Sequence, residues 1–141
     1  SKAYGLAALR VGYALSSAQI ADVLNRVRQP FNVNSLALAA ACAALDDADY
    51  LAQSRQLNDA GMLQLEAGLR ELGLSWIPSK GNFIAVDFGR DTAAINQALL
   101  RAGVIVRPVA GYGMPNFLRV SIGLPAENAR FLDALAKVLN A

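Results

Sequence analysis

Hydrophobic and polar positions repeat along the chain with a period that changes several times, and each period predicts one kind of element. Over residues 9–15 the two kinds of position alternate at period two, which predicts a strand after an opening loop. From residue 18 to residue 28 apolar side chains recur every three or four positions, which predicts a helix. Ser16 and Ser17 offer a cap for its start, and Gln29-Pro30 ends it because proline disfavours helix in the preceding residue.

Two longer helical patterns follow. The first is rich in alanine and begins at residues 32–35, and the acidic run over 46–49 interrupts or bends it. The second runs from about residue 50 to residue 72, and Gly73 predicts its end. The side chains of this second helix that are expected to face a core are Leu51, Leu57, Met62, Leu65 and Leu69.

The rest of the chain alternates between strand and helix patterns, which predicts an α/β fold with a small sheet covered by helices on one face. The expected strand segments are 76–78, 82–88, 104–107 and 117–123, of which the third is expected to be buried. Helices are expected over 91–102 and 126–140, and a loop with two glycines over 110–116. We place a domain boundary near residue 48, which gives the domains 1–48 and 49–141.

The composition adds an expectation about assembly. Hydrophobic residues make up 55% of the 141 positions and charged residues 17%, against roughly 25% charged residues in typical soluble domains. Such an apolar excess predicts a surface that a partner covers, so we expect a homo-oligomer, such as a homodimer. The net charge of +2 comes from scattered side chains, which predicts no nucleic-acid partner.

Rare residue types exclude several kinds of chemistry. The sequence has 0 histidines, which excludes Ser-His-Asp catalysis and histidine metal sites within it. Its lone cysteine, Cys42, is expected to pack as a small apolar side chain and fits a cytoplasmic location. The acidic run over 46–49 lacks the spacing of a calcium loop, so we expect helix caps there and no metal site. The longest apolar stretch, 36–45, is too short to span a bilayer, so no membrane partner is expected.

The first residues of the sequence, Ser-Lys-Ala-Tyr-Gly-Leu-Ala-Ala-Leu-Arg-Val-Gly-Tyr, carry the clearest candidate chemistry. Lys2 has an amine that can form a Schiff base with an aldehyde and then move a proton. Arg10 has a guanidinium that can bind a phosphate through two parallel hydrogen bonds. Each of them alone is also consistent with an exposed charged side chain. Together they are the groups that pyridoxal phosphate chemistry needs.

This segment resembles the second half of the signature of class-II aminotransferases of fold type I. The resemblance implies pyridoxal 5'-phosphate as the cofactor, Lys2 as its catalytic Schiff-base lysine, and Arg10 and Ser1 as ligands of its phosphate. Ala8 is a mild departure, because the histidinol-phosphate branch of the family commonly has glycine there. Other positions that fit the pattern are Ala3, Tyr4 and Gly5.

Two later segments resemble the histidinol-phosphate branch of this family: Gly-Val-Ile-Val-Arg-Pro at 103–108 and Asn-Phe-Leu-Arg-Val-Ser-Ile-Gly at 116–123. The resemblance implies that Arg119 grips the substrate carboxylate and that Arg107 meets the phosphate of histidinol phosphate. Without it, both arginines could pair with carboxylates on neighbouring helices. Asn82 is expected either to face the site or to bond its own backbone in a turn. Tyr112 is a weaker candidate for lining the substrate pocket.

The resemblance implies amino transfer from histidinol phosphate to 2-oxoglutarate, giving imidazole acetol phosphate and glutamate, in histidine biosynthesis. It also implies that residues 1–48 are a remnant of the large cofactor-binding domain and residues 49–141 the small C-terminal α+β domain. We therefore expect a C-terminal fragment that starts at the cofactor lysine and is inactive, or nearly so, alone. The alternatives are an aromatic amino-acid aminotransferase of the same fold and, for the fragment alone, a non-catalytic oligomerising α/β module.

Overall fold

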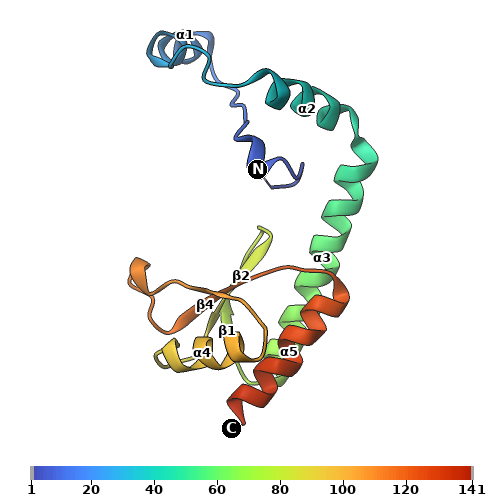
Figure 1. Ribbon diagram of the computed structural model, residues 1–141, viewed down its shortest axis with the longest axis vertical. Coiled ribbons are helices and arrows are strands. Elements are labelled where there is room, and N and C mark those ends of the chain that lie inside the picture. Colours follow the sequence, from blue (N-terminus) through green and yellow to red (C-terminus); the bar gives the residue numbers. More distant parts are fainter. Residues whose placement is uncertain (1, 141) are drawn as a thin grey trace. The chain divides into compact units, whose positions relative to one another are not determined.

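The computed structural model describes residues 2–140 and divides the chain into two compact units, residues 1–55 and residues 56–141 (Figure 1). The division falls within one long helix, α3 (Ala48–Glu71). The helices and the antiparallel sheet confirm the predicted mixed α/β class.

The first unit consists of helices and irregular segments. It contains the 3-10 turn η1 (Ala7–Leu9), α1 (Ala18–Val27), α2 (Ser35–Asp46) and the start of α3. The Ser17 hydroxyl accepts the Ile20 N–H at the start of α1, as predicted. Asn34 caps α2 in the same way, accepting the Ala37 N–H at 2.8 Å. Asp47 accepts the Tyr50 N–H at 2.9 Å, which confirms the prediction that the acidic run caps a helix.

The strand predicted over residues 9–15 is wrong. Leu9 closes η1, and Arg10 ends it in a left-handed conformation with φ 53°. A strand needs a neighbour for its backbone hydrogen bonds, and the described residues of this unit form no other strand. The last two of the alternating apolar side chains consequently face solvent, with Tyr13 72% and Leu15 91% exposed.

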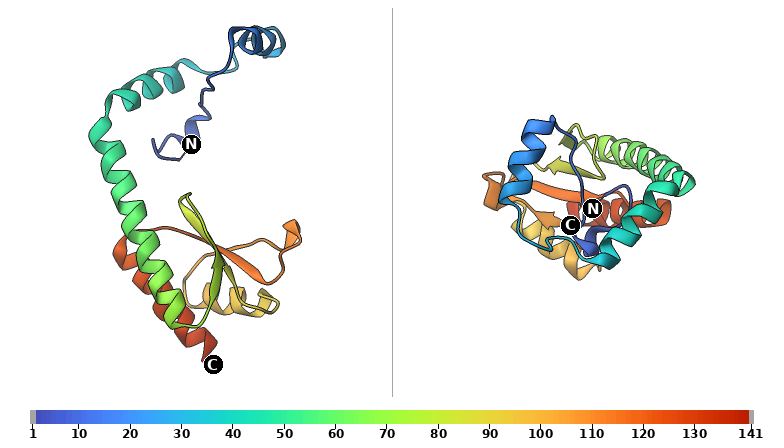
Figure 2. Two further views of the ribbon diagram at one scale, coloured as in Figure 1. Left: turned by 180° about the vertical axis from the view of Figure 1, so that it is seen from behind. Right: turned by 90° about the horizontal axis from the view of Figure 1, so that it is seen from above.

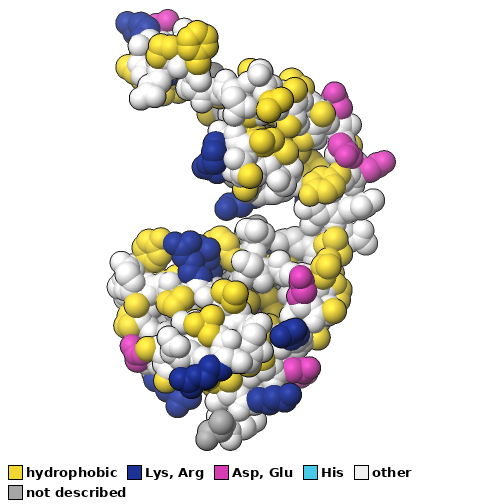
Figure 3. Space-filling model, viewed as in Figure 1, with side chains coloured by type: hydrophobic (Ala, Val, Ile, Leu, Met, Phe, Trp, Pro, Cys, Tyr) yellow, Lys and Arg dark blue, Asp and Glu magenta, His cyan; other side chains and the backbone are white. Residues whose placement is uncertain are grey.

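Helices α1 and α2 present apolar side chains at the surface of the first unit (Figure 3). No residue of α1 is buried, and α2 buries only Ala37. Cys42 is exposed, so the prediction that it packs in the interior is wrong for this unit. No helix in the part of the chain that the structure describes is long and apolar enough to cross a membrane.

The second unit is built on a four-stranded antiparallel sheet in the order β1-β2-β4-β3. Its strands are β1 (Ser75–Ile77), β2 (Phe83–Asp87), β3 (Arg107–Pro108) and β4 (Phe117–Ser121). The other elements are α4 (Ala93–Arg101), the 3-10 turn η2 (Ala110–Tyr112) and α5 (Pro125–Leu139).

The core of the second unit lies on one face of this sheet, between the strands and the helices (Figure 2). Alternate residues of the two central strands point into it, Ile84 and Val86 from β2 and Leu118 and Val120 from β4. The helices contribute Leu65, Leu69, Ile95, Leu99, Phe131 and Leu135. The prediction of helices on one face is therefore confirmed. We call the opposite side, which carries Phe83, Ala85, Arg107, Phe117 and Arg119, the open face.

Two details of the predicted core are wrong. Leu57 was expected to face inward but is 48% exposed. The expected buried strand over 104–107 is reduced to Arg107–Pro108, and Ile105 is 86% exposed. The reason is local, because the N–H groups of Gly103 and Val104 bond to the last carbonyls of α4, those of Leu100 and Leu99. The backbone before Arg107 therefore closes a helix and does not extend the sheet.

Candidate active site

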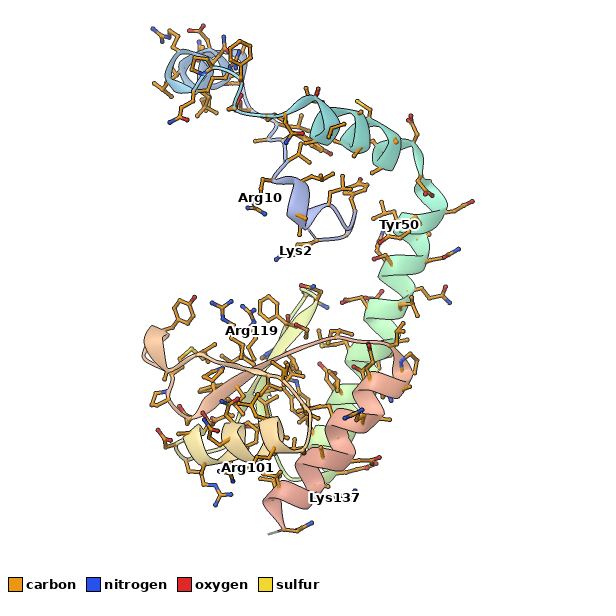
Figure 4. All side chains as sticks on the ribbon, viewed as in Figure 1. Lys2, Arg10, Tyr50, Arg101, Arg119 and Lys137 are labelled. Carbon is orange, nitrogen blue, oxygen red and sulfur yellow. The ribbon has the colours of Figure 1, made fainter. Side chains whose placement is uncertain are left out.

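Lys2 lies in a tight turn whose shape depends on Gly5. The Gly5 N–H donates to the Lys2 carbonyl at 2.9 Å. Gly5 has φ +68°, and a Cβ added to it would lie 2.9 Å from the Tyr50 hydroxyl oxygen. The positive φ therefore favours glycine at this position, and an added Cβ would also have to displace the Tyr50 hydroxyl. The Lys2 side chain is exposed (Figure 4).

Arg10 follows in the same unit, at the end of η1. Its left-handed backbone is uncommon for a residue other than glycine. One terminal nitrogen, Nη1, donates to the Ala7 carbonyl at 2.8 Å, which ties the side chain to its own turn. The other N–H groups of the guanidinium are left for a ligand.

Arg107 and Arg119 form a pair on the open face of the second unit. They are register partners across β3 and β4. Two like charges directly opposite one another normally destabilise a sheet, so an anion bound between them would stabilise this arrangement. Arg119 is partly buried, and its Nε has no hydrogen-bond partner among residues 2–140. Its guanidinium carbon lies 4.8 Å from the centroid of the Phe83 ring.

The remaining predicted site residues are less constrained. Asn82 precedes β2, its carbonyl accepts the Ile122 N–H at 2.9 Å, and its side chain is exposed. Tyr112 is in η2 and is 70% exposed. Ser1 lies outside the described residues. The structure therefore brings Arg107 and Arg119 together in one unit, and holds Lys2 and Arg10 near η1 in the other.

The four cationic side chains of the candidate site form no ion pair in the described part of the chain, so they remain available to ligands. In the described part of the chain the one ion pair joins Arg26 to Asp22 within α1. The same residues hold no group of three or more side chains that could bind a metal ion. An exposed amine, and guanidinium groups that form no ion pair in the described part of the chain, suit an aldehyde that carries a phosphate, and a carboxylate substrate. This donor set fits pyridoxal phosphate and its amino and keto acid substrates.

Sequence reasoning did not assign two contacts at these sites. The Tyr50 hydroxyl beside Gly5 comes from α3, more than forty residues later in the chain, so no local pattern connects the two residues. The Phe83 ring beside Arg119 depends on the register of β2 against β4. The pattern around Phe83 predicted its strand, but not which cross-strand neighbour the ring would contact.

Comparison with known proteins gives the class of this protein. The sequence matches the family described as aminotransferase class I and II over residues 1–135. The chain therefore belongs to the class I and II aminotransferases. This confirms the resemblance seen in the lysine segment.

Similar proteins make the relationship more specific. The chain is 82% identical over 139 residues to histidinol-phosphate aminotransferase 2 of Pseudomonas aeruginosa, covering 99% of this chain and 38% of that protein. It is 65% identical over 144 residues to histidinol-phosphate aminotransferase of Stutzerimonas stutzeri, with the same coverage of 99% and 38%. The chain thus spans well under half the length of these relatives.

A solved structure agrees with the sequence relationship. The crystal structure of histidinol-phosphate aminotransferase from Sinorhizobium meliloti, in complex with pyridoxal-5'-phosphate, superposes with a TM-score of 0.86 at 34% identity. The likeness covers 99% of this chain and 39% of that one. The family and this complex confirm pyridoxal phosphate as the expected cofactor.

Proposed function

We propose that this chain supplies part of the active site of a pyridoxal-phosphate-dependent transaminase in histidine biosynthesis. Its substrates would be histidinol phosphate and 2-oxoglutarate, and its products imidazole acetol phosphate and glutamate. The observation that carries the proposal is the register pairing of Arg107 with Arg119 on the open face. Two adjacent guanidinium groups suit substrates that carry a phosphate or two carboxylates.

Lys2 and Arg10 would act on the cofactor side of the reaction. Pyridoxal phosphate, when bound, withdraws electrons from the substrate carbon whose C–H bond breaks. We propose that the Lys2 Nζ would hold the cofactor through its aldehyde group and, when free, would carry the proton from that substrate carbon to the aldehyde carbon, as transfer of the amino group requires. Arg10 would hold the cofactor phosphate through the N–H groups that Ala7 does not use. Ser1 would add its hydroxyl.

The second unit would bind the substrates. Arg119 would bind the substrate carboxylate through both terminal nitrogens, and Arg107 the phosphate of histidinol phosphate. Asn82 and Tyr112, both exposed, would line the same substrate site. Together these contacts would orient the amino or keto group of the substrate.

We further propose that residues 1–48 belong to the family's large domain and residues 49–141 to its small domain. A cofactor needs groups that orient and tune its ring, and the chain spans 38% of its Pseudomonas aeruginosa relative. The 141 residues alone would accordingly be inactive or nearly so. The exposed apolar side chains of α1 and α2 support a homo-oligomer, and the free Cys42 thiol suits the cytoplasm.

A graft tests the substrate assignment. The chain would replace the matching 139 residues of the Pseudomonas aeruginosa relative, to which it is 82% identical. We expect the graft to transaminate histidinol phosphate faster than an aromatic amino acid. Arg107→Gln should lower the activity toward histidinol phosphate more than the activity toward the aromatic amino acid. Arg101→Gln, on α4, is the control for loss of one positive charge. A graft that prefers the aromatic amino acid would overturn the assignment.

A further inference from the structure

The Phe83 ring and the Arg119 guanidinium are neighbours on the open face. Phe83 is on β2 and Arg119 on β4, and the register pairs Phe83 with Ser121 and Ala85 with Arg119. The two residues are therefore diagonal cross-strand neighbours, within reach of an aromatic side chain. The guanidinium carbon lies 4.8 Å from the ring centroid, within the range of a cation–π interaction. Arg119 is labelled in Figure 4.

A second arginine–aromatic pair in this unit differs from the Phe83–Arg119 pair in how far water reaches its guanidinium. Arg70, at the end of α3, lies 5.5 Å from the centroid of the Trp76 ring and is otherwise exposed to water. At Arg119 the Nε is buried without a hydrogen-bond partner in the described part of the chain. Arg119 also has Arg107 as its register partner. The Arg119 cation has therefore lost water at its Nε, and it stands opposite a second arginine in the register of the sheet.

We propose that Phe83 is a positioning residue for anion binding, which holds the Arg119 guanidinium ready before a ligand arrives. The inference rests on the anion-binding role proposed for Arg119. The negative face of the ring attracts the guanidinium and offsets part of the cost of its lost hydration. Stacking on the ring leaves the guanidinium edge, with its two terminal nitrogens, directed at a carboxylate.

Holding the guanidinium in advance strengthens binding for an entropic reason. An arginine side chain that is free to rotate loses that freedom when an anion binds, and the loss lowers the affinity. An Arg119 side chain already held by Phe83 loses less conformational entropy when the anion binds. The ring also excludes water beside the Nε, which strengthens the remaining electrostatic attraction.

The first arm of the test measures the order of Arg119 without ligand. In the 141-residue chain, 15N relaxation of the Arg119 Nε–Hε group should show an ordered side chain, with an Hε resonance displaced by the Phe83 ring current. F83L and F83M should each abolish the displacement and the order, and F83Y should keep both. F117L, which removes a ring from the same strand and face as Arg119, is the matched control and should change neither. An equally ordered Arg119 in F83L and F83M would overturn the inference.

The second arm measures anion binding by titrating the same proteins with 2-oxoglutarate. F83L should bind about fivefold more weakly than the wild type, F83Y and F117L should bind normally, and R119Q should lose the site. If R119Q binds as the wild type does, the proposed role of Arg119 fails. If R119Q loses binding but F83L keeps it, only the positioning role fails. No response of Arg119 to 2-oxoglutarate in the wild type would count against both.

Phe83 is outside the buried core, so its substitution should leave the fold intact. Backbone amide spectra and the fluorescence of Trp76, the one tryptophan, check this for every variant.

Discussion

Arg107 and Arg119 stand opposite one another in the register of β3 and β4, on the face of the sheet that no helix of the second unit covers. Neither forms an ion pair in the part of the chain that the structure describes. Because like charges directly opposite one another destabilise a sheet, we expect this arrangement to cost stability without an anion and to favour anion binding.

Removing one of these charges should therefore stabilise the ligand-free chain. We expect Arg107→Gln to raise the free energy of unfolding by about 0.2–1 kcal/mol at low salt, with a smaller gain at high salt because ions screen the repulsion. Phosphate should stabilise the wild type more than this variant. Urea unfolding followed by Trp76 fluorescence measures both effects, with Arg101→Gln as the control. A less stable Arg107→Gln protein at low salt would show that the pair is not repulsive.

The turn that carries Lys2 should be weakened by any side chain at Gly5. In Gly5→Ala the new methyl group would approach the Tyr50 hydroxyl, and the left-handed backbone costs on the order of 1–2 kcal/mol for alanine. We expect faster hydrogen exchange at the amide that bonds the Lys2 carbonyl. Gly12→Ala is the control, since nothing lies within 4 Å of its added Cβ and its φ is not positive. Equal exchange in the two variants would mean that Gly5 does not shape the turn.

Asn128 should be the most sensitive polar residue of the second unit. It is 2% exposed, and its amide bonds the N–H and the carbonyl of Gly123 and the side chain of Gln64. Asn128→Ala would leave the Gly123 groups without partners, and we expect a loss of about 1–3 kcal/mol in unfolding free energy. Asn58→Ala removes one exposed hydrogen bond, to the Gly81 carbonyl, and should cost less. Similar losses in urea unfolding would contradict this ranking.

The close approach of α3 to the segment after β4 should depend on Gly61. A Cβ there would lie 2.5 Å from Ile122 Cγ2 and 3.3 Å from the Gly123 carbonyl oxygen. Alanine usually stabilises a helix by about 1 kcal/mol relative to glycine, but the clash should outweigh this gain. Gly61→Ala should therefore lower the melting temperature, and Ile122→Ala should recover part of the loss in the double variant. A higher melting temperature for Gly61→Ala alone would refute the close approach.

Local signals predicted much of this fold. Ser17 caps a helix as expected, because a cap depends on residues three positions apart. The two stretches that failed, 9–15 and 104–107, each carry a strand signal, which is alternation in the first and a short apolar run in the second. A strand forms only where a partner supplies hydrogen bonds, and that partner is set by the tertiary fold.

For the candidate site, too, local features could be predicted and features set by the tertiary fold could not. Lys2, Arg10, Arg107 and Arg119 could be named from short motifs, because each motif keeps its chemistry within a few residues. The facing of Arg107 and Arg119 and the contact of Phe83 with Arg119 could not be predicted, because both depend on how distant strands align.

Covalent trapping of the cofactor on Lys2 tests the central claim most directly. The chain is mixed with a small excess of pyridoxal phosphate and reduced with borohydride, and the modified lysine is mapped by mass spectrometry. Lys80 and Lys137, the other lysines, are internal controls, and Arg10→Gln tests the phosphate contact. We predict selective labelling of Lys2 that weakens in Arg10→Gln and with pyridoxal lacking the phosphate. Equal labelling of all the lysines would contradict the claim that this chain holds the cofactor at Lys2.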